Sequence, residues 1–106
     1  MKTIAISTRT YKTCGDELQD VLGLDITMEE AVKRCVHNWN CLVQQDQKNT
    51  KDFYVSIAQI PDTPIDPDDG VVYDYYDKSI VLPENWENDA ESEDVVKDGK
   101  LVALNV

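Results

Sequence analysis

The stretch 27–45 reads TMEEAVKRCVHNWNCLVQQ and contains the strongest periodicity in this chain of 106 residues. Thr27 is a candidate helix N-cap, and Glu30 three residues later completes a capping box. Beyond the cap, apolar side chains recur at steps of four, three, four and three residues, at Met28, Val32, Cys35, Trp39 and Leu42. This spacing predicts an amphipathic helix over about residues 28–45, with one face on a core.

On both sides of this helix the apolar period changes to two, which is typical of half-buried strands. The alternation predicts strands at 3–8, 53–58 and 71–76, and residues 79–82 extend the last of these or form another. The Asp98-Gly99 pair lies between two β-favouring runs, so it predicts a hairpin near the end of the chain.

The remaining segments predict a second helix and two loops. Asp16 with Gln19 three positions on is a capping pattern, and Gly23 is a natural stop, so we expect a short helix at about 16–22. Residues 61–70 are rich in turn-forming residues. Residues 83–94 are acidic and polar, and we expect a loop or a frayed helix there.

Together these elements predict an α+β fold in one domain spanning residues 1–106. We expect a mainly antiparallel sheet of four to five strands, with the long helix (about 28–45) and the short helix packed on one face. The apolar content of 42% suits a globular protein. The sequence has no apolar run long enough to span a membrane, and its first apolar stretch is too short for a signal peptide, so we expect a cytoplasmic protein.

The net charge of −11 is unevenly placed along the chain. Residues 1–60 carry eight acidic residues against seven Lys and Arg, whereas residues 61–106 carry thirteen against three. Such a field attracts basic partners and repels other polyanions. The charge therefore argues against direct binding of nucleic acid or of an anionic membrane, and in favour of a basic protein partner.

The acidic second half contains the residues that we predict to contact this partner. Clustered carboxylates can approach the charge density of duplex DNA, which is about one charge per 1.7 Å of axis. Trp86 is expected to anchor the patch, and a tyrosine beside an aspartate to extend it. The predicted partner-binding residues are Asp74, Tyr76, Asp77, Glu84, Trp86, Glu87, Glu91, Glu93 and Asp94.

The cysteines suggest a different kind of site. An odd number of cysteines fits no closed disulfide framework, so we expect Cys14, Cys35 and Cys41 to be reduced and mostly buried. His37 precedes Cys41 by one helical turn, and the two could share a metal or form a base–thiol pair, with Cys14 as a third member.

Signals for catalysis, cofactors and metals are otherwise missing from the sequence. It contains no Gly-rich phosphate loop and no CxxC, and with Gly70 at position six of an EF-hand loop, Ile65 and Pro67 would occupy ligand positions. We therefore predict a protein that is not an enzyme, with no cofactor and no metal, and leave open whether residues 62–69 hold a cation weakly.

In size and acidity the chain is similar to small phage-encoded inhibitors, such as anti-CRISPR and anti-restriction proteins. It is equally similar to bacterial immunity proteins that neutralise basic nuclease toxins. The resemblance implies an inhibitor that docks on a basic, nucleic-acid-binding protein surface as a DNA mimic. The alternatives are a small metal- or thiol-dependent domain using His37 and Cys41, and an assembly subunit that pairs through the sheet edge at Leu101–Val106.

Overall fold

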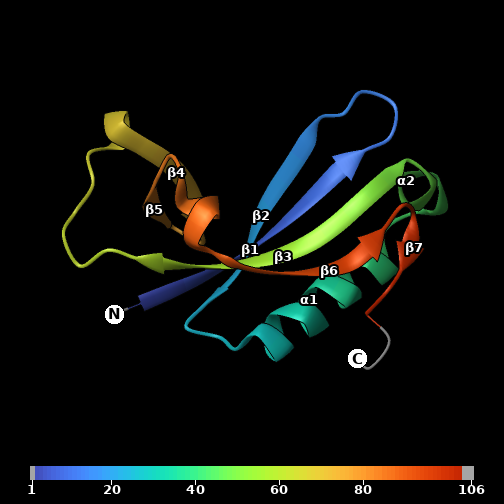
Figure 1. The fold of residues 1–106 in the computed structure, drawn as a ribbon, viewed down its shortest axis with the longest axis horizontal. Helices are drawn as coiled ribbons and strands as arrows, with labels where there is room; N and C mark the ends of the chain where they lie inside the picture. The colour runs from blue at the N-terminus through green and yellow to red at the C-terminus, as the bar shows by residue number, and fades with distance from the viewer. Residues whose placement is uncertain (1, 104–106) are drawn as a thin grey trace.

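The computed structural model describes residues 2–103 and has the predicted α+β architecture (Figure 1). A five-stranded antiparallel sheet has the order β2-β1-β3-β6-β7, and a separate two-stranded sheet pairs β4 with β5. The strands are β1 (Lys2–Tyr11), β2 (Glu17–Leu24), β3 (Thr50–Ile60), β4 (Gly70–Tyr75), β5 (Lys78–Pro83), β6 (Glu91–Lys97) and β7 (Lys100–Leu101). The helices are α1 (Met28–Cys41), α2 (Gln44–Lys48) and the short 3-10 turns η1 (Pro67–Asp69) and η2 (Trp86–Asp89).

Helix α1 begins as its sequence predicts. The side chain of Thr27 accepts a hydrogen bond of 3.1 Å from the backbone N–H of Glu30. Lys33 and Arg34 form i,i+4 ion pairs with the glutamates one turn earlier, on the exposed side of the helix. The opposite side packs Ala31, Val32, Cys35 and Trp39 against the sheet.

The helix ends at Cys41, four residues before the predicted boundary. Leu42 and Val43 are extended, and the chain then forms α2 before it enters β3. The side chain of Gln47, in α2, donates a hydrogen bond of 2.8 Å to the carbonyl oxygen of Trp39 in the last turn of α1, which also accepts one from the backbone N–H of Leu42. The end of α1 is therefore stabilised by the side chain of Gln47, which the apolar periodicity of the helix does not predict.

The predicted short helix at 16–22 is wrong, because these residues form most of β2. Leu18, Val21 and Leu22 fit a helical stripe and a strand about equally well over so few residues. Pairing with the ten-residue strand β1 decides in favour of the strand, from Thr10 opposite Glu17 to Ile4 opposite Leu24. The predicted fold still contains a short helix, but it is α2.

One further prediction differs from the structure in part, and another is confirmed. Residues 83–94 contain η2, as a frayed helix would, but Glu91–Asp94 belong to β6, where they pair with β3. The predicted hairpin at Asp98-Gly99 is confirmed, and both residues have positive φ, of 51° and 80°, as a type I′ turn requires. Of the predicted edge segment Leu101–Val106, residues 104–106 lie outside the described residues.

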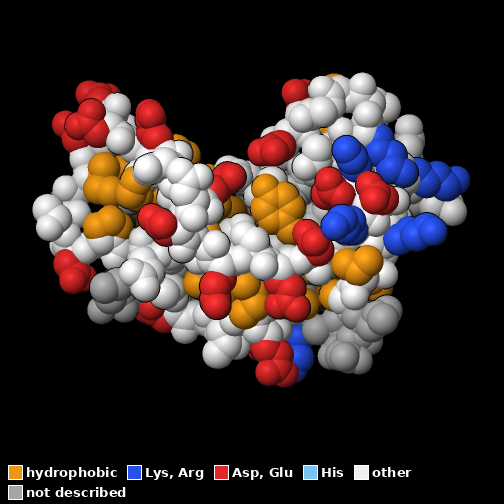
Figure 2. Space-filling view, in the orientation of Figure 1, with side chains coloured by type: hydrophobic (Ala, Val, Ile, Leu, Met, Phe, Trp, Pro, Cys, Tyr) orange, Lys and Arg blue, Asp and Glu red, His pale blue; other side chains and the backbone are white. Residues whose placement is uncertain are grey.

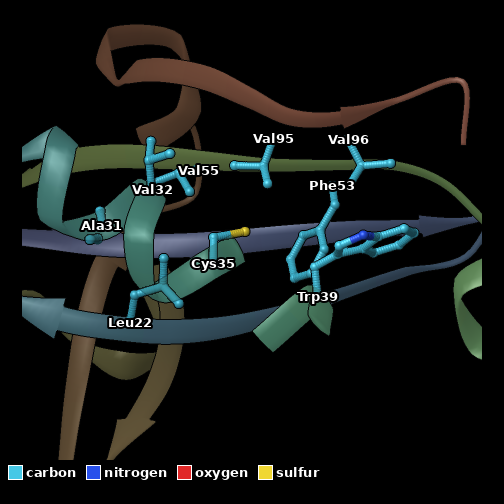
Figure 3. Close-up of a cluster of buried hydrophobic side chains, with 10 residues drawn as sticks. Leu22, Ala31, Val32, Cys35, Trp39, Phe53, Val55, Val95 and Val96 are labelled. Carbon is cyan, nitrogen blue, oxygen red and sulfur yellow. The ribbon is translucent and has the colours of Figure 1, made fainter. Parts of the chain in front are cut away.

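The main sheet is covered on both faces, by different elements. On one face α1 covers a core that includes Phe53, Val55 and Val96 (Figure 3). On the other face the β4–β5 hairpin and η2 cover Ile4 and Ile6 of β1. The elements on this second face contribute Tyr73, Leu82 and Trp86, and the rings of Tyr73 and Trp86 meet edge to face at 6.1 Å.

The second core gives a stability prediction. Leu82 has no exposed surface and packs with Ile4 and Ile6, so Leu82→Ala leaves a cavity and should cost about 2–5 kcal/mol. Val72→Ala in the same hairpin is the matched control, because Val72 is 46% exposed and should cost less than about 1 kcal/mol. Urea unfolding curves measure both values. Similar losses for the two variants would contradict a second core.

Candidate acidic recognition face

On the second face, the β4–β5 hairpin and η2 cover only part of the main sheet, and polar residues lie beyond them. The antiparallel register places Gln19, Thr8, Tyr54 and Asp94 in one row across four strands, and Glu17, Thr10 and Asp52 in the next row. These side chains lie on the side opposite α1, because residues paired directly across strands share a face. With Glu87 from η2, the open residues form what we call the acidic face: Glu17, Gln19, Asp52, Tyr54, Glu87 and Asp94.

Gln19 connects this open half of the sheet to the covering elements. Its side-chain amide donates to the hydroxyl of Thr8 at 3.2 Å and to the carboxylate of Glu87 at 3.1 Å. Its carbonyl oxygen accepts a hydrogen bond of 2.7 Å from the hydroxyl of Tyr73. Because one side chain holds β1, β4 and η2 together, the carboxylate of Glu87 is kept at the border of the acidic face.

Tyr54 lies among the carboxylates of this face. Partial burial raises its pKa above the usual range, the charges of Glu87, Glu17 and Asp52 raise it further, and a hydrogen bond with Thr8 opposes the shift. The pKa of Tyr73 is raised in the same way, first by burial and then by Glu87 and Glu17. Both phenols therefore experience the negative potential of the acidic face.

The carboxylates of the acidic face are not neutralised by the protein itself. Within residues 2–103 the ion pairs are the two on α1, Lys33 with Glu29 and Arg34 with Glu30. Figure 2 shows acidic side chains over the whole of this face, including the hollow between the two lobes, whereas most of the visible Lys and Arg side chains gather at the end near the β6–β7 hairpin. An aromatic ring beside unpaired carboxylates suits a guanidinium or an ammonium group.

The structure distributes the predicted partner-binding residues over several surfaces. Asp74, Tyr76 and Asp77 lie at the closed end of the β4–β5 hairpin, and Glu84 lies beyond its open end, before η2. Glu91 and Glu93 pair with Ile57 and Val55, so they lie on the side of the sheet that faces α1. Of the nine residues, Glu87 and Asp94 belong to the acidic face.

The expectation that Trp86 is an exposed anchor is wrong. Trp86 is only 6% exposed and packs in the second core, with its ring against Tyr73. Tyr76, in contrast, is 87% exposed and stacks against Tyr75 with a centroid distance of 4.5 Å. Trp86 is therefore a core residue, although the acidic residues near it in the sequence are exposed.

Four residues of the acidic face come from the half of the chain that is nearly neutral: Glu17, Gln19, Asp52 and Tyr54. The sequence contains a signal for two of them, because Tyr54 alternates with Phe53 and Val55 in the strand predicted at 53–58, and Asp52 directly precedes it in the same alternation. Glu17 and Gln19 follow the same alternation, but only if residues 17–24 are identified as a strand.

The thiols are arranged differently from the prediction. Cys35 is buried as expected, but Cys14 and Cys41 are exposed. Sγ of Cys41 lies 3.6 Å from Nε2 of His37, so the predicted pair is brought together on the exposed side of α1. Cys14 lies in the β1–β2 loop. Among residues 2–103, no three His, Cys, Asp or Glu side chains are grouped so that they could hold a metal ion, and this includes the loop at 62–69.

Comparison of the chain with protein-family models, with curated proteins and with solved structures found no match. No helix within residues 2–103 combines the length and the apolar character that crossing a membrane would require.

The phenols of Tyr54 and Tyr73 predict a loss of stability in alkali. Because the folded-state pKa values of Tyr54 and Tyr73 are raised, the unfolded chain ionises first, at about pH 10, and the folded state loses stability as the pH rises through that value. Phenolate absorbance and urea unfolding measure the two effects. The double variant Glu17→Gln/Glu87→Gln should lower the pKa of Tyr54, whereas Glu29→Gln on α1 should not; equal effects would contradict this electrostatic environment.

The thiols predict a pattern of chemical reactivity. Burial raises the pKa of Cys35 to about 12, so this thiol is neutral and shielded in the folded protein. A thiol reagent at neutral pH should rapidly modify Cys14 and Cys41 and should reach Cys35 only after unfolding. Cys41→Ala is the control and should remove one fast-reacting group. Three fast-reacting thiols in the folded wild-type protein would contradict the burial of Cys35.

Proposed function

We propose that this protein is a small acidic inhibitor that docks its acidic face on the basic surface of a nucleic-acid-binding protein, in the cytoplasm. The observation that supports this proposal is the set of carboxylates around Tyr54 that form no ion pair within residues 2–103, on strands held by antiparallel pairing. Arginine and lysine side chains of the partner would enter between these carboxylates, with the ring of Tyr54 as an apolar contact.

The spacing of the carboxylates suits this role. Glu17 and Asp52 flank Thr10 in one row, so their backbones are separated by two strand spacings, or about 10 Å. Asp94 lies directly across from Tyr54, at a side-chain separation of about 5 Å. Two carboxylates about 10 Å apart in one row and a third, that of Asp94, in the next row give this side of the molecule a negative potential, which steers a basic groove toward it.

An anti-defence inhibitor from a phage and an immunity protein that neutralises a nuclease toxin are both consistent with this binding mode. The identity of the captured protein separates them. A basic nuclease made by the same cell favours the immunity protein, and a component of a nucleic-acid-targeting defence complex favours the phage inhibitor. In both cases duplex DNA should compete with this protein for its partner.

The test compares two charge reversals with the same change in net charge. Glu17→Lys/Asp94→Lys alters the acidic face, and Asp62→Lys/Asp69→Lys alters exposed residues on the loop before β4. Partner is captured from the native host at low salt, and its dissociation constant is then measured for each variant. We expect the first variant to lose binding by about tenfold or more and the second to bind nearly as the wild type does.

Raising the salt concentration should weaken wild-type binding, because long-range attraction between charges is screened. Equal losses for the two variants would show that net charge, and not this face, attracts the partner. Capture of a partner without a basic surface would contradict the proposed function altogether. Circular dichroism of both variants should show that each retains the fold.

A further inference from the structure

A buried arginine lies on the opposite side of the sheet from the acidic face. Arg9 of β1 pairs directly with Leu18 and Phe53, so its side chain lies on the face that α1 covers. The residue is only 8% exposed. A buried guanidinium usually requires an acidic partner or several acceptors, because removing a charge from water costs several kcal/mol.

The protein satisfies this charge only in part. Nη2 of Arg9 donates to the hydroxyl of Tyr11, and the guanidinium carbon lies 4.8 Å from the centroid of the Tyr11 ring. Nε is buried and has no hydrogen-bond partner. No carboxylate within residues 2–103 forms an ion pair with Arg9, although the chain carries 21 acidic residues.

Arg9 also lines a cavity of about 390 Å³ between the β1–β2 hairpin and the end of α1. Ser7 and Asn38 add polar groups to its wall, and Leu18, Leu42 and Phe53 add apolar surface. Phe53 is also part of the core beneath α1, where the centroid of its ring lies 6.5 Å from that of Trp39 (Figure 3). The cavity therefore combines one cation, one carboxylate (Asp20), two neutral polar residues and an apolar wall. Small-molecule sites have the same mixture of apolar wall and few polar groups.

We propose that this cavity binds a small organic carboxylate. Its carboxylate would accept hydrogen bonds from the guanidinium of Arg9, whose planar fork matches the two carboxylate oxygens. Its apolar body would lie against Leu18, Leu42 and Phe53. The ligand should carry a single negative charge, because Arg9 is the one cationic residue in the lining, while Asp20 in the same lining and the overall charge of −11 disfavour any further negative charge.

Asp20 sharpens the specificity of the site. Asp20 lines the same cavity, and its carboxylate does not form an ion pair with Arg9. The carboxylate repels a second negative charge, so a dianion such as phenyl phosphate should bind more weakly than benzoate. For the same reason, Asp20→Asn should strengthen the binding of benzoate several-fold.

The experiment uses benzoate as the probe and benzamide, its neutral analogue, as the matched control. NMR spectra of the isotope-labelled full chain follow the backbone amides and the Nε–H of Arg9 during each titration. We expect saturable shifts at Ser7, Arg9 and Asn38 with benzoate. The dissociation constant of benzamide should be at least about tenfold higher than that of benzoate. Arg9→Met retains much of the apolar stem and should abolish the response, whereas Lys33→Met should leave it unchanged.

Several results would overturn the proposal. These are shifts that do not saturate, shifts confined to the Lys-rich end of the molecule, equal binding of benzamide, or unchanged binding by a folded Arg9→Met variant. If Arg9→Met fails to fold, the comparison of benzoate with benzamide and the response of Asp20→Asn decide the matter, since neither alters Arg9. Because the cavity and the acidic face lie on opposite sides of the sheet, failure of this proposal leaves the proposed function untouched.

Discussion

The burial of β1 on both of its faces is the constraint on which the rest of the structure depends. All six residues from Ile4 to Arg9 are buried. Because successive side chains of a strand point to opposite faces, both faces of this stretch are shielded from solvent. Ala5 requires the cover that α1 provides, and Ile4 and Ile6 require the β4–β5 hairpin and η2 on the other side. A two-layer fold with a helix on one face would leave these isoleucines in water. The second cover extends only over the apolar part of the sheet, and the acidic face begins where it ends.

This arrangement explains why the acidic face is built from both halves of the chain. The strands β2 and β3 supply Glu17 and Asp52 from the nearly neutral half, and η2 and β6 supply Glu87 and Asp94 from the acidic half. Unpaired carboxylates on one face repel each other and reduce the stability of the folded state. A backbone held by antiparallel pairing on either side, and by the hydrogen bonds of Gln19, keeps them in place despite that repulsion.

The sequence predicts the fold class, α1 and most strands, because capping and apolar periodicity are local properties. It does not predict β2, since Leu18, Val21 and Leu22 suit either period and only pairing with β1 selects the strand. The same error hides Glu17 and Gln19 from the predicted site. The prediction for Trp86 fails for another reason: net charge along the chain does not reveal which side chain turns inward, and Trp86 turns toward Tyr73. The cavity beside Arg9 depends on contacts between distant segments, which no local pattern contains.

The most direct measurement is an NMR titration of the labelled protein with a short oligoarginine peptide, which carries the chemistry of a basic partner without its identity. If the open half of the second face recognises guanidinium groups, the saturable shifts will cluster at Thr8, Gln19, Tyr54 and Asp94, including the ring protons of Tyr54. Shifts centred instead on the loop at 62–69, or spread evenly over every exposed carboxylate, would show that these carboxylates attract cations only as a diffuse charge.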